Sequence, residues 1–184
     1  MKTMQKFLRI LVCSLLITLS LTGCERRRMS KELKEFMTKT ITIPNGIVRV
    51  LGRNVQYDSK FGGKPYLVIY HGPEECSTCV LSHNYMDCSY LKKVQDSGKC
   101  EVVVIFAPSE ADEDKMLDYM RAMDTDFPLY FDQYDYFSAQ NPDLPIDLRM
   151  HSFLIDAEGH PVFVGNPMSS PALDKLFWQV LNKL

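Results

Sequence analysis

The sequence predicts an α/β protein in which a central mixed sheet is flanked by helices and preceded by a strand and helix extension. Three observations carry this prediction. Two continuous apolar runs, 65–72 and 100–109, have the composition of buried central strands. The stretches that follow them repeat apolar residues at helical spacing. A later pair of apolar segments within 151–167 is joined by a glycine turn, as in an antiparallel hairpin.

The first 23 residues differ from the rest of the chain. They carry three basic and no acidic residues and then become an apolar run that is short for a membrane span, as in a secretory signal peptide. The run ends Leu21-Thr22-Gly23-Cys24, which resembles the lipobox of bacterial lipoproteins. The resemblance implies cleavage before Cys24 and lipid attached to its sulfur. The alternative is an ordinary secretory signal, and in either case the mature chain leaves the cytoplasm.

Composition and charge limit the possible partners. The chain has 184 residues, is 46% hydrophobic and 24% charged, and can form one domain with a full core. Its net charge is −2, and removal of residues 1–23 takes away three positive charges and leaves −5. No basic stripe follows residue 28. We therefore expect no nucleic-acid partner.

The mature chain is expected to begin with a tether and a short extension of the fold. We assign residues 24–40 to a lipidated tether with a short helix over 29–40, and residues 41–184 to the folded domain. Residues 41–59 alternate apolar and polar side chains between turn signals, which predicts one or two short strands.

The remaining elements follow in chain order. One helix is predicted over 76–98, where apolar residues recur every three or four positions, and a second over 109–124. Residues 127–150 are broken by proline and are expected to hold a short strand and a loop or short helix. Two strands are predicted within 151–167, and a helix with a serine cap and an early proline over 169–184.

The segment His71-Gly72-Pro73-Glu74-Glu75-Cys76-Ser77-Thr78-Cys79 places two cysteines where the first long strand gives way to a helix. Amide groups at a helix start favour a thiolate at Cys76. Cys79 lies one turn later and can attack a mixed disulfide formed at Cys76. The spacing therefore supplies an attacking and a resolving sulfur.

Two stretches resemble a known family. GGKPYLVIYHGPEECSTC and FLIDAEGHPVFV are similar to segments of thioredoxin-like thiol-disulfide oxidoreductases and redoxins, especially exported members tethered to a membrane. The likeness covers about residues 40–184. It implies a thioredoxin-like fold, with Cys76 as nucleophile and Cys79 as resolving cysteine. It also implies no organic cofactor and protein dithiols or disulfides of the cell envelope as partners, in the periplasm or at the cell surface.

The sequence departs from the family pattern at three places. Glu75 replaces the aromatic residue, most often Trp, that usually precedes the first cysteine. Met150 stands where a cis proline usually precedes the second motif, so we assign Met150 and His151 to the substrate-binding surface. Tyr70 or His71 occupies the position of the usual buried acid.

Two acidic residues precede the first cysteine and bear on its chemistry. The carboxylates of Glu74 and Glu75 disfavour a thiolate at Cys76 and should raise its pKa. A less stabilised thiolate gives a less oxidising pair, which predicts a reductant or an isomerase rather than a strong oxidase. The alternative is that both side chains point into solvent and act weakly.

Other functions stay open at this level. A cluster of possible soft ligands would suit copper(I) or zinc: His71, Cys76, Cys79, His83 and Cys88. The missing proline also fits a redox-silent thioredoxin fold that serves as a binding module. A peroxidase is disfavoured because the C-x-x-C spacing suits disulfide exchange.

Two further cysteines lie beyond the C-x-x-C pair. Cys88 and Cys100 could pair in a structural disulfide or remain two buried thiols, and Cys88 could act as a third redox cysteine.

Overall fold

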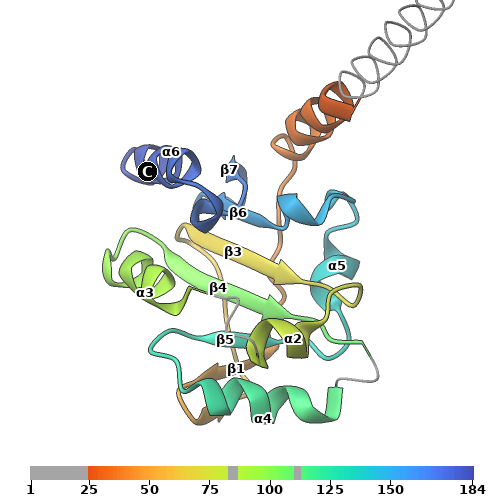
Figure 1. The fold of residues 1–184 in the computed structure, drawn as a ribbon, viewed down its shortest axis with the longest axis vertical. Coiled ribbons are helices and arrows are strands. Elements are labelled where there is room, and N and C mark those ends of the chain that lie inside the picture. Colours follow the sequence, from red (N-terminus) through yellow and green to blue (C-terminus); the bar gives the residue numbers. More distant parts are fainter. Residues whose placement is uncertain (1–24, 83–86, 110–112) are drawn as a thin grey trace, which may run out of the picture. The chain divides into compact units, whose positions relative to one another are not determined.

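The computed structural model of the chain describes residues 25–82, 87–109 and 113–184 (Figure 1). The chain divides into two compact units, with the boundary between Glu35 and Phe36. The helix predicted over 29–40 is observed from residue 25, the first that the structure describes, to Phe36. The predicted signal peptide and Cys24 lie outside the described residues. Among the helices that the structure describes, none is long and apolar enough to cross a membrane.

The second unit is built on a seven-stranded mixed sheet in the order β2-β1-β5-β4-β3-β6-β7. Its three central strands β3, β4 and β5 are parallel, and the neighbours at either side are antiparallel to them. Figure 1 shows β5 between β4 and β1. The strands are β1 Val48–Leu51, β2 Asn54–Gln56, β3 Tyr66–His71, β4 Glu101–Phe106, β5 Leu129–Phe131, β6 Ser152–Ile155 and β7 Pro161–Val164.

Strands β3 and β4 confirm the prediction that the two apolar runs of the sequence form buried central strands. All six residues of β3 pair with β4, from Tyr66 opposite Glu101 to His71 opposite Phe106. Such runs stay apolar throughout because both faces of the sheet are covered. The N-terminal extension is a hairpin, as the alternation predicts. Its strand β1 continues the sheet beyond β5, with Val50 opposite Leu129.

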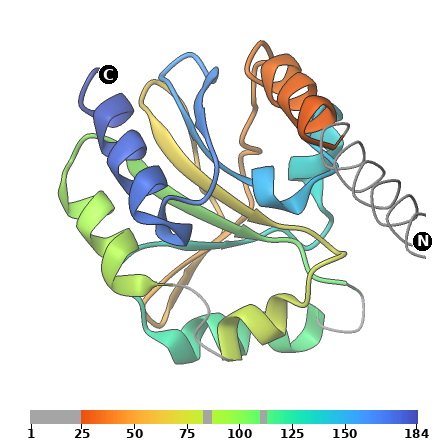
Figure 2. The ribbon, with the colours of Figure 1, turned by 45° about the horizontal axis from the view of Figure 1, so that its top comes forward.

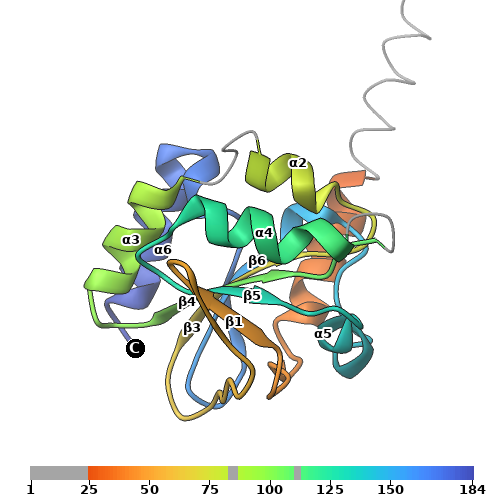
Figure 3. The same ribbon diagram turned by 90° about the horizontal axis from the view of Figure 1, so that it is seen from below.

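Four helices cover one face of the sheet (Figure 3). The chain steps from β3 to β4 to β5 in one direction, and right-handed crossovers then place the connecting helices on one side. The C-terminal helix joins them, and α3 and α6 lie side by side (Figure 2), where the Tyr90 hydroxyl donates to Asp174 at 2.8 Å. The helices are α2 Ser77–Ser82, α3 Cys88–Asp96, α4 Glu113–Met123 and α6 Pro171–Leu181.

The opposite face is covered by irregular chain and one short helix. Helix α5, Tyr136–Gln140, contributes the buried Phe137. Phe36 packs edge-on against Phe153 of β6, with ring centroids 5.1 Å apart. The segment 41–47, which turns at Gly46, supplies further apolar side chains to this second core.

The prediction of one helix over 76–98 is wrong, because the structure has two helices there. Residues 83–86 lie outside the description, and α3 begins anew after Asp87, whose carboxylate accepts the backbone N–H of Tyr90 at 3.0 Å. A side chain that caps a helix favours a new start at that point. The predicted end of the segment is confirmed, since Gly98 takes a positive φ of 66° just beyond α3.

The C-terminal part confirms the predicted hairpin and the predicted last helix. Strands β6 and β7 form the predicted hairpin, and Gly159 takes a φ of 91° in its turn. Helix α6 begins with Ser170, whose side chain accepts the N–H of Leu173, and with Pro171 in its first turn. Parallel β3, β4 and β5 followed by this hairpin and a covering helix make the thioredoxin-like arrangement expected from the sequence.

Candidate functional site

The two cysteines of the C-x-x-C motif form a disulfide at one end of the sheet. Their Cα atoms are 5.1 Å apart. Strand β3 ends at His71, a short loop follows, and α2 begins directly after Cys76. Cys76 is exposed and Cys79 is half-buried. Cys76 is therefore the more accessible of the two cysteines.

Backbone hydrogen bonds hold the loop before the disulfide. The N–H of Glu75 donates to the Gly72 carbonyl at 3.0 Å, and the N–H of Ser77 donates to the Glu75 carbonyl at 2.9 Å. The N–H of Cys79 points at the sulfur of Cys76 at 3.2 Å. A donor at that distance favours negative charge on Cys76 once the disulfide is reduced. Helix α2 has only six described residues, so the local N–H of Cys79, and not a helix dipole, is the group that favours a Cys76 thiolate.

The two glutamates before Cys76 have different surroundings. Glu74 is exposed to solvent. The Glu75 side chain is only 22% exposed, and its Oε2 lies 3.0 Å from Nδ1 of His71, whose side chain is 16% exposed. The structure thus rejects the alternative that both carboxylates point freely into solvent. The residue that replaces the usual aromatic is one half of a partly buried acid–imidazole pair.

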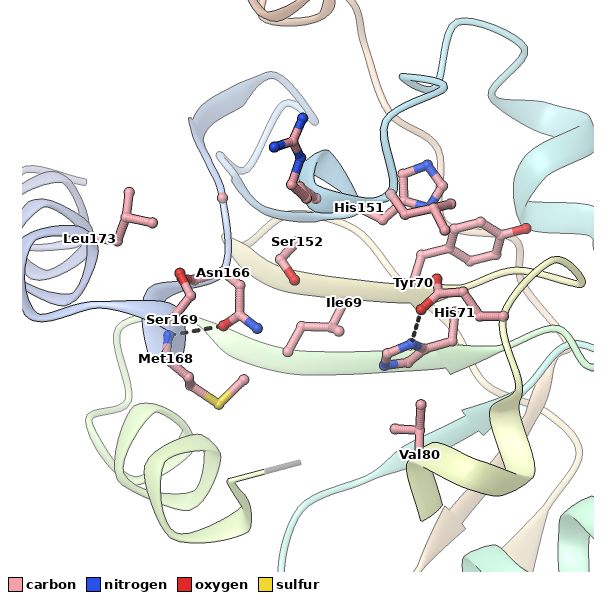
Figure 4. A pocket seen from close by; sticks show the side chains of 14 residues that line it. Ile69, Tyr70, His71, Val80, His151, Ser152, Asn166, Met168, Ser169 and Leu173 are labelled. Carbon is pink, nitrogen blue, oxygen red and sulfur yellow. Dashed lines mark hydrogen bonds and ion pairs between the residues drawn. The ribbon is translucent and has the colours of Figure 1, made fainter. Parts of the chain in front are cut away.

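A cavity of about 470 Å³ opens beside the disulfide loop (Figure 4). Figure 4 shows His71 and Val80 on one side of it, and Asn166, Met168 and Leu173 on the other. The full lining is Ile69, Tyr70, His71, Glu75, Val80, Leu148, Arg149, His151, Ser152, Gly165, Asn166, Met168, Ser169 and Leu173. Apolar surface predominates in this lining, and its charged or strongly polar side chains are His71, Glu75, Arg149, His151 and Asn166.

The structure separates the two residues assigned to the substrate-binding surface. Met150 ends the 3₁₀ turn Leu148–Met150, is 6% exposed, and does not line the cavity. His151 does line it, and its Nε2 lies 2.8 Å from the Pro145 carbonyl. The His151 carbonyl accepts the backbone N–H of Tyr70 at 2.9 Å, which ties this segment to β3. Within the described residues no peptide bond is cis.

Tyr70 and His71 occupy the region of the usual buried acid, and each contacts an acid from elsewhere. The Tyr70 hydroxyl donates to Oδ1 of Asp135 at 2.6 Å. Burial, together with this hydrogen bond, raises the pKa of Tyr70 far above its ordinary value. The ring of Tyr70 also packs against those of Phe137 and His151, with centroids 5.0 Å and 5.4 Å away. Tyr70 is therefore a neutral, packed side chain that fixes the end of β3.

The other two described cysteines are free thiols in this structure, so the possible structural disulfide is not formed. Cys88 is half-buried, and burial raises its pKa. Cys100 is buried, and desolvation raises its pKa to about 12. Since the thiolate is the reactive form, both are poor nucleophiles at neutral pH.

The cluster of possible metal ligands is only partly described, because His83 lies outside the described residues. Among the histidine, cysteine, aspartate and glutamate side chains that are described, no group of three or more is placed to hold a metal ion.

Sequence reasoning did not find the far wall of the cavity. Asn166 and Met168 belong to the turn after β7, where Asn166 Oδ1 accepts the N–H of Met168 at 2.9 Å, and Leu173 belongs to α6. The turn and the helix start are recognisable in the sequence. Their position across the cavity from His71 and Val80 follows only from the antiparallel pairing of β6 with β3 and of β7 with β6.

No protein-family model matches the chain, and no curated protein matches its sequence. Among solved structures it is similar to AhpC of Enterococcus faecalis, with TM-score 0.49, 14% identity, and coverage of 78% of this chain and 89% of that one. It is similar to the thioredoxin domain of a thiol-disulfide oxidoreductase from Bacteroides vulgatus (TM-score 0.45, 20% identity, 77% and 100% coverage). A third is a secreted Mycobacterium tuberculosis disulfide oxidoreductase homologous to E. coli DsbE (TM-score 0.42, 18% identity, 82% and 98% coverage). These likenesses are too distant to carry a function, which has to follow from the chain's own residues.

Proposed function

We propose that the protein is a thiol-disulfide oxidoreductase that exchanges its Cys76–Cys79 disulfide with dithiols and disulfides of partner proteins in the bacterial cell envelope. One observation carries the proposal: an exposed Cys76 is bonded to a half-buried Cys79 at the end of a central parallel strand. The cavity beside this pair gives a partner segment room to approach it.

The exchange consists of two half-reactions: reduction of the protein disulfide, and then reduction of a substrate disulfide through a mixed disulfide. A reducing dithiol first gives two electrons and two protons to the Cys76–Cys79 bond and itself becomes a disulfide. The Cys76 thiolate then attacks a substrate disulfide, forms a mixed disulfide, and releases one substrate thiolate, which takes up a proton. The Cys79 thiolate attacks the sulfur of Cys76, re-forms the intramolecular bond and releases the second substrate thiol.

The expected direction is reduction or isomerisation. The carboxylates of Glu74 and Glu75 lie next to Cys76 in the chain and oppose a strongly stabilised thiolate. A strong oxidant needs a reduced form that is stabilised well beyond an ordinary dithiol. The acidic setting therefore favours a pair that donates electrons.

Equilibration of the purified full chain, in detergent, with glutathione buffers tests the proposal. We expect Cys76 and Cys79 to pass reversibly between dithiol and disulfide, as read by mass spectrometry after acid quench and thiol alkylation. A Cys88→Ser variant is the matched control and should titrate like the wild type. If the pair never forms a reversible disulfide, the oxidoreductase function is lost and a redox-silent binding module is favoured. Stoichiometric copper(I) or zinc that Cys79→Ser abolishes would favour metal binding instead.

Attachment to the envelope is proposed from the segment that ends at Cys24. In a bacterial host, the full chain should be recovered in the detergent phase with a mass that includes lipid on Cys24. A Cys24→Ser variant should lose the lipid and move to the aqueous phase, because the anchor is the source of the membrane affinity. Cys13→Ser is the matched control, since this cysteine lies in the segment to be removed. Recovery of unlipidated wild type would contradict the anchor.

A further inference from the structure

Glu75 creates a difficulty for the proposed exchange, because a negative carboxylate directly before Cys76 opposes the thiolate that must attack. We propose that His71 is a positioning residue that holds the Glu75 carboxylate at the cavity wall and offsets its charge, so that Cys76 stays reactive. This inference rests on the proposed function and concerns the same site. Its support is the contact between Nδ1 of His71 and Oε2 of Glu75 at 3.0 Å.

His71 is held in place by groups other than Glu75. It is the last residue of β3, and its carbonyl accepts the N–H of Ala107 at 2.9 Å. Its ring stacks on Phe106 of the neighbouring strand, with centroids 4.9 Å apart and planes inclined by 15°. The stacked face fixes the plane of the imidazole. The stacking on Phe106 therefore also fixes the direction in which Nδ1 can form a hydrogen bond.

Glu75 is less constrained than its partner. It belongs to the loop between β3 and α2, four residues after His71, and its N–H donates to the Gly72 carbonyl. Both side chains line the cavity together with Val80, the residue after Cys79 (Figure 4). A dashed line in Figure 4 joins the His71 imidazole to this carboxylate. The imidazole held by the sheet thus positions the carboxylate of the loop residue.

Other charged groups near the cavity have contacts of their own. The guanidinium of Arg149 donates to Asp147 through Nε at 2.9 Å and through Nη2 at 2.6 Å. His151 directs Nε2 to the Pro145 carbonyl. Glu74 is exposed and stays unchanged in every variant of the test. Among the described contacts of the cavity lining, the His71 contact is the one that accounts for the position of the Glu75 carboxylate.

The pair acts on Cys76 in either protonation state of the imidazole. A neutral ring donates Nδ1–H to the carboxylate and fixes where the negative charge lies. A protonated ring makes the same contact and also cancels the charge of Glu75. Without the donor, an uncompensated carboxylate is free to approach the sulfur of the next residue, and the Cys76 thiolate becomes less favourable.

Two substitutions and their combination test the inference. His71→Phe keeps a ring that stacks on Phe106 and removes the hydrogen bond, whereas Glu75→Gln removes the charge and keeps an acceptor. In fully reduced protein we expect His71→Phe to slow alkylation of Cys76 at pH 7 by about threefold to tenfold, as for an uncompensated charge in a partly exposed site. The pH profile of that rate should shift to higher pH. Peptide mass mapping assigns the modification to Cys76.

The double variant shows whether His71→Phe slows Cys76 through the Glu75 carboxylate or through a general disturbance of the site. Glu75→Gln alone should react at least as fast as the wild type, and His71→Phe/Glu75→Gln should react like Glu75→Gln. His71→Gln, which keeps a donor, should lie closer to the wild type than His71→Phe does. Urea unfolding of each variant shows that the fold is kept.

Two results would overturn the inference. One is an unchanged Cys76 profile in His71→Phe, and the other is a double variant as slow as His71→Phe alone. Either result leaves the reversible disulfide of the wild type untouched. Conversely, a pair that does not equilibrate with glutathione removes the proposed function, while the alkylation rates still report on the contact between His71 and Glu75.

Discussion

Replacement of Cys76 by Ser is expected to abolish disulfide exchange, with a loss of turnover on the order of a thousandfold or more, because a neutral hydroxyl cannot replace a thiolate as nucleophile. Replacement of Cys79 by Ser should have a different result. Cys76 can then still attack a substrate disulfide, but nothing resolves the product. A covalent complex should accumulate that a reducing agent releases. The exposure of Cys76 and the half-buried position of Cys79 predict this asymmetry.

The measurement is turnover of a small protein disulfide by the full chain with a dithiol as electron donor, followed by electrophoresis without reductant to detect the covalent complex. Cys88→Ser is the matched control, since its half-buried thiol has a raised pKa and should contribute little. A mixed disulfide that accumulates in Cys76→Ser and not in Cys79→Ser would reverse the two roles. Full activity of Cys76→Ser would place the chemistry elsewhere.

Truncation of Phe153 to Ala should cause a large loss of stability. Phe153 lies in the middle of β6, is fully buried, and packs against Phe36. Removal of a buried phenylalanine ring costs about 3–5 kcal/mol through lost burial and the cavity that remains. That is a large part of the roughly 5–15 kcal/mol by which a domain is stable. Urea unfolding monitored by circular dichroism measures the difference in the free energy of unfolding.

The matched control is Tyr57→Ala, an aromatic truncation at a side chain that is 68% exposed, which should change stability by at most about 0.5 kcal/mol. Phe153→Leu should fall between the two. Loss of the Phe153 ring should also disturb the functional site, because β6 begins directly after His151 and pairs with β3. A Phe153→Ala variant as stable as Tyr57→Ala would show that Phe36 and β6 do not form one core.

The sequence predicts most of this fold because its strands and helices bury continuous or periodic apolar faces. The runs that become β3 and β4 are apolar at nearly every position, as needed for strands covered on both sides. The break before α3 escapes prediction for a local reason. Apolar periodicity continues across it, while the new start depends on a hydrogen bond from the Tyr90 N–H to Asp87 that the periodicity does not report.

The sequence by itself determined that Cys76 and Cys79 can form a disulfide, since the C-x-x-C spacing after a buried strand already places two sulfurs within bonding distance. Only the tertiary structure decided what surrounds them. Burial of the His71 side chain against Phe106 depends on the register between β3 and β4. The contact of Tyr70 with Asp135 joins residues that are 65 positions apart. Spacing along a chain fixes neighbours within one turn, such as Cys76 and Cys79, whereas contacts between distant segments are set by strand pairing, and these hold Tyr70 and the His71 ring in place.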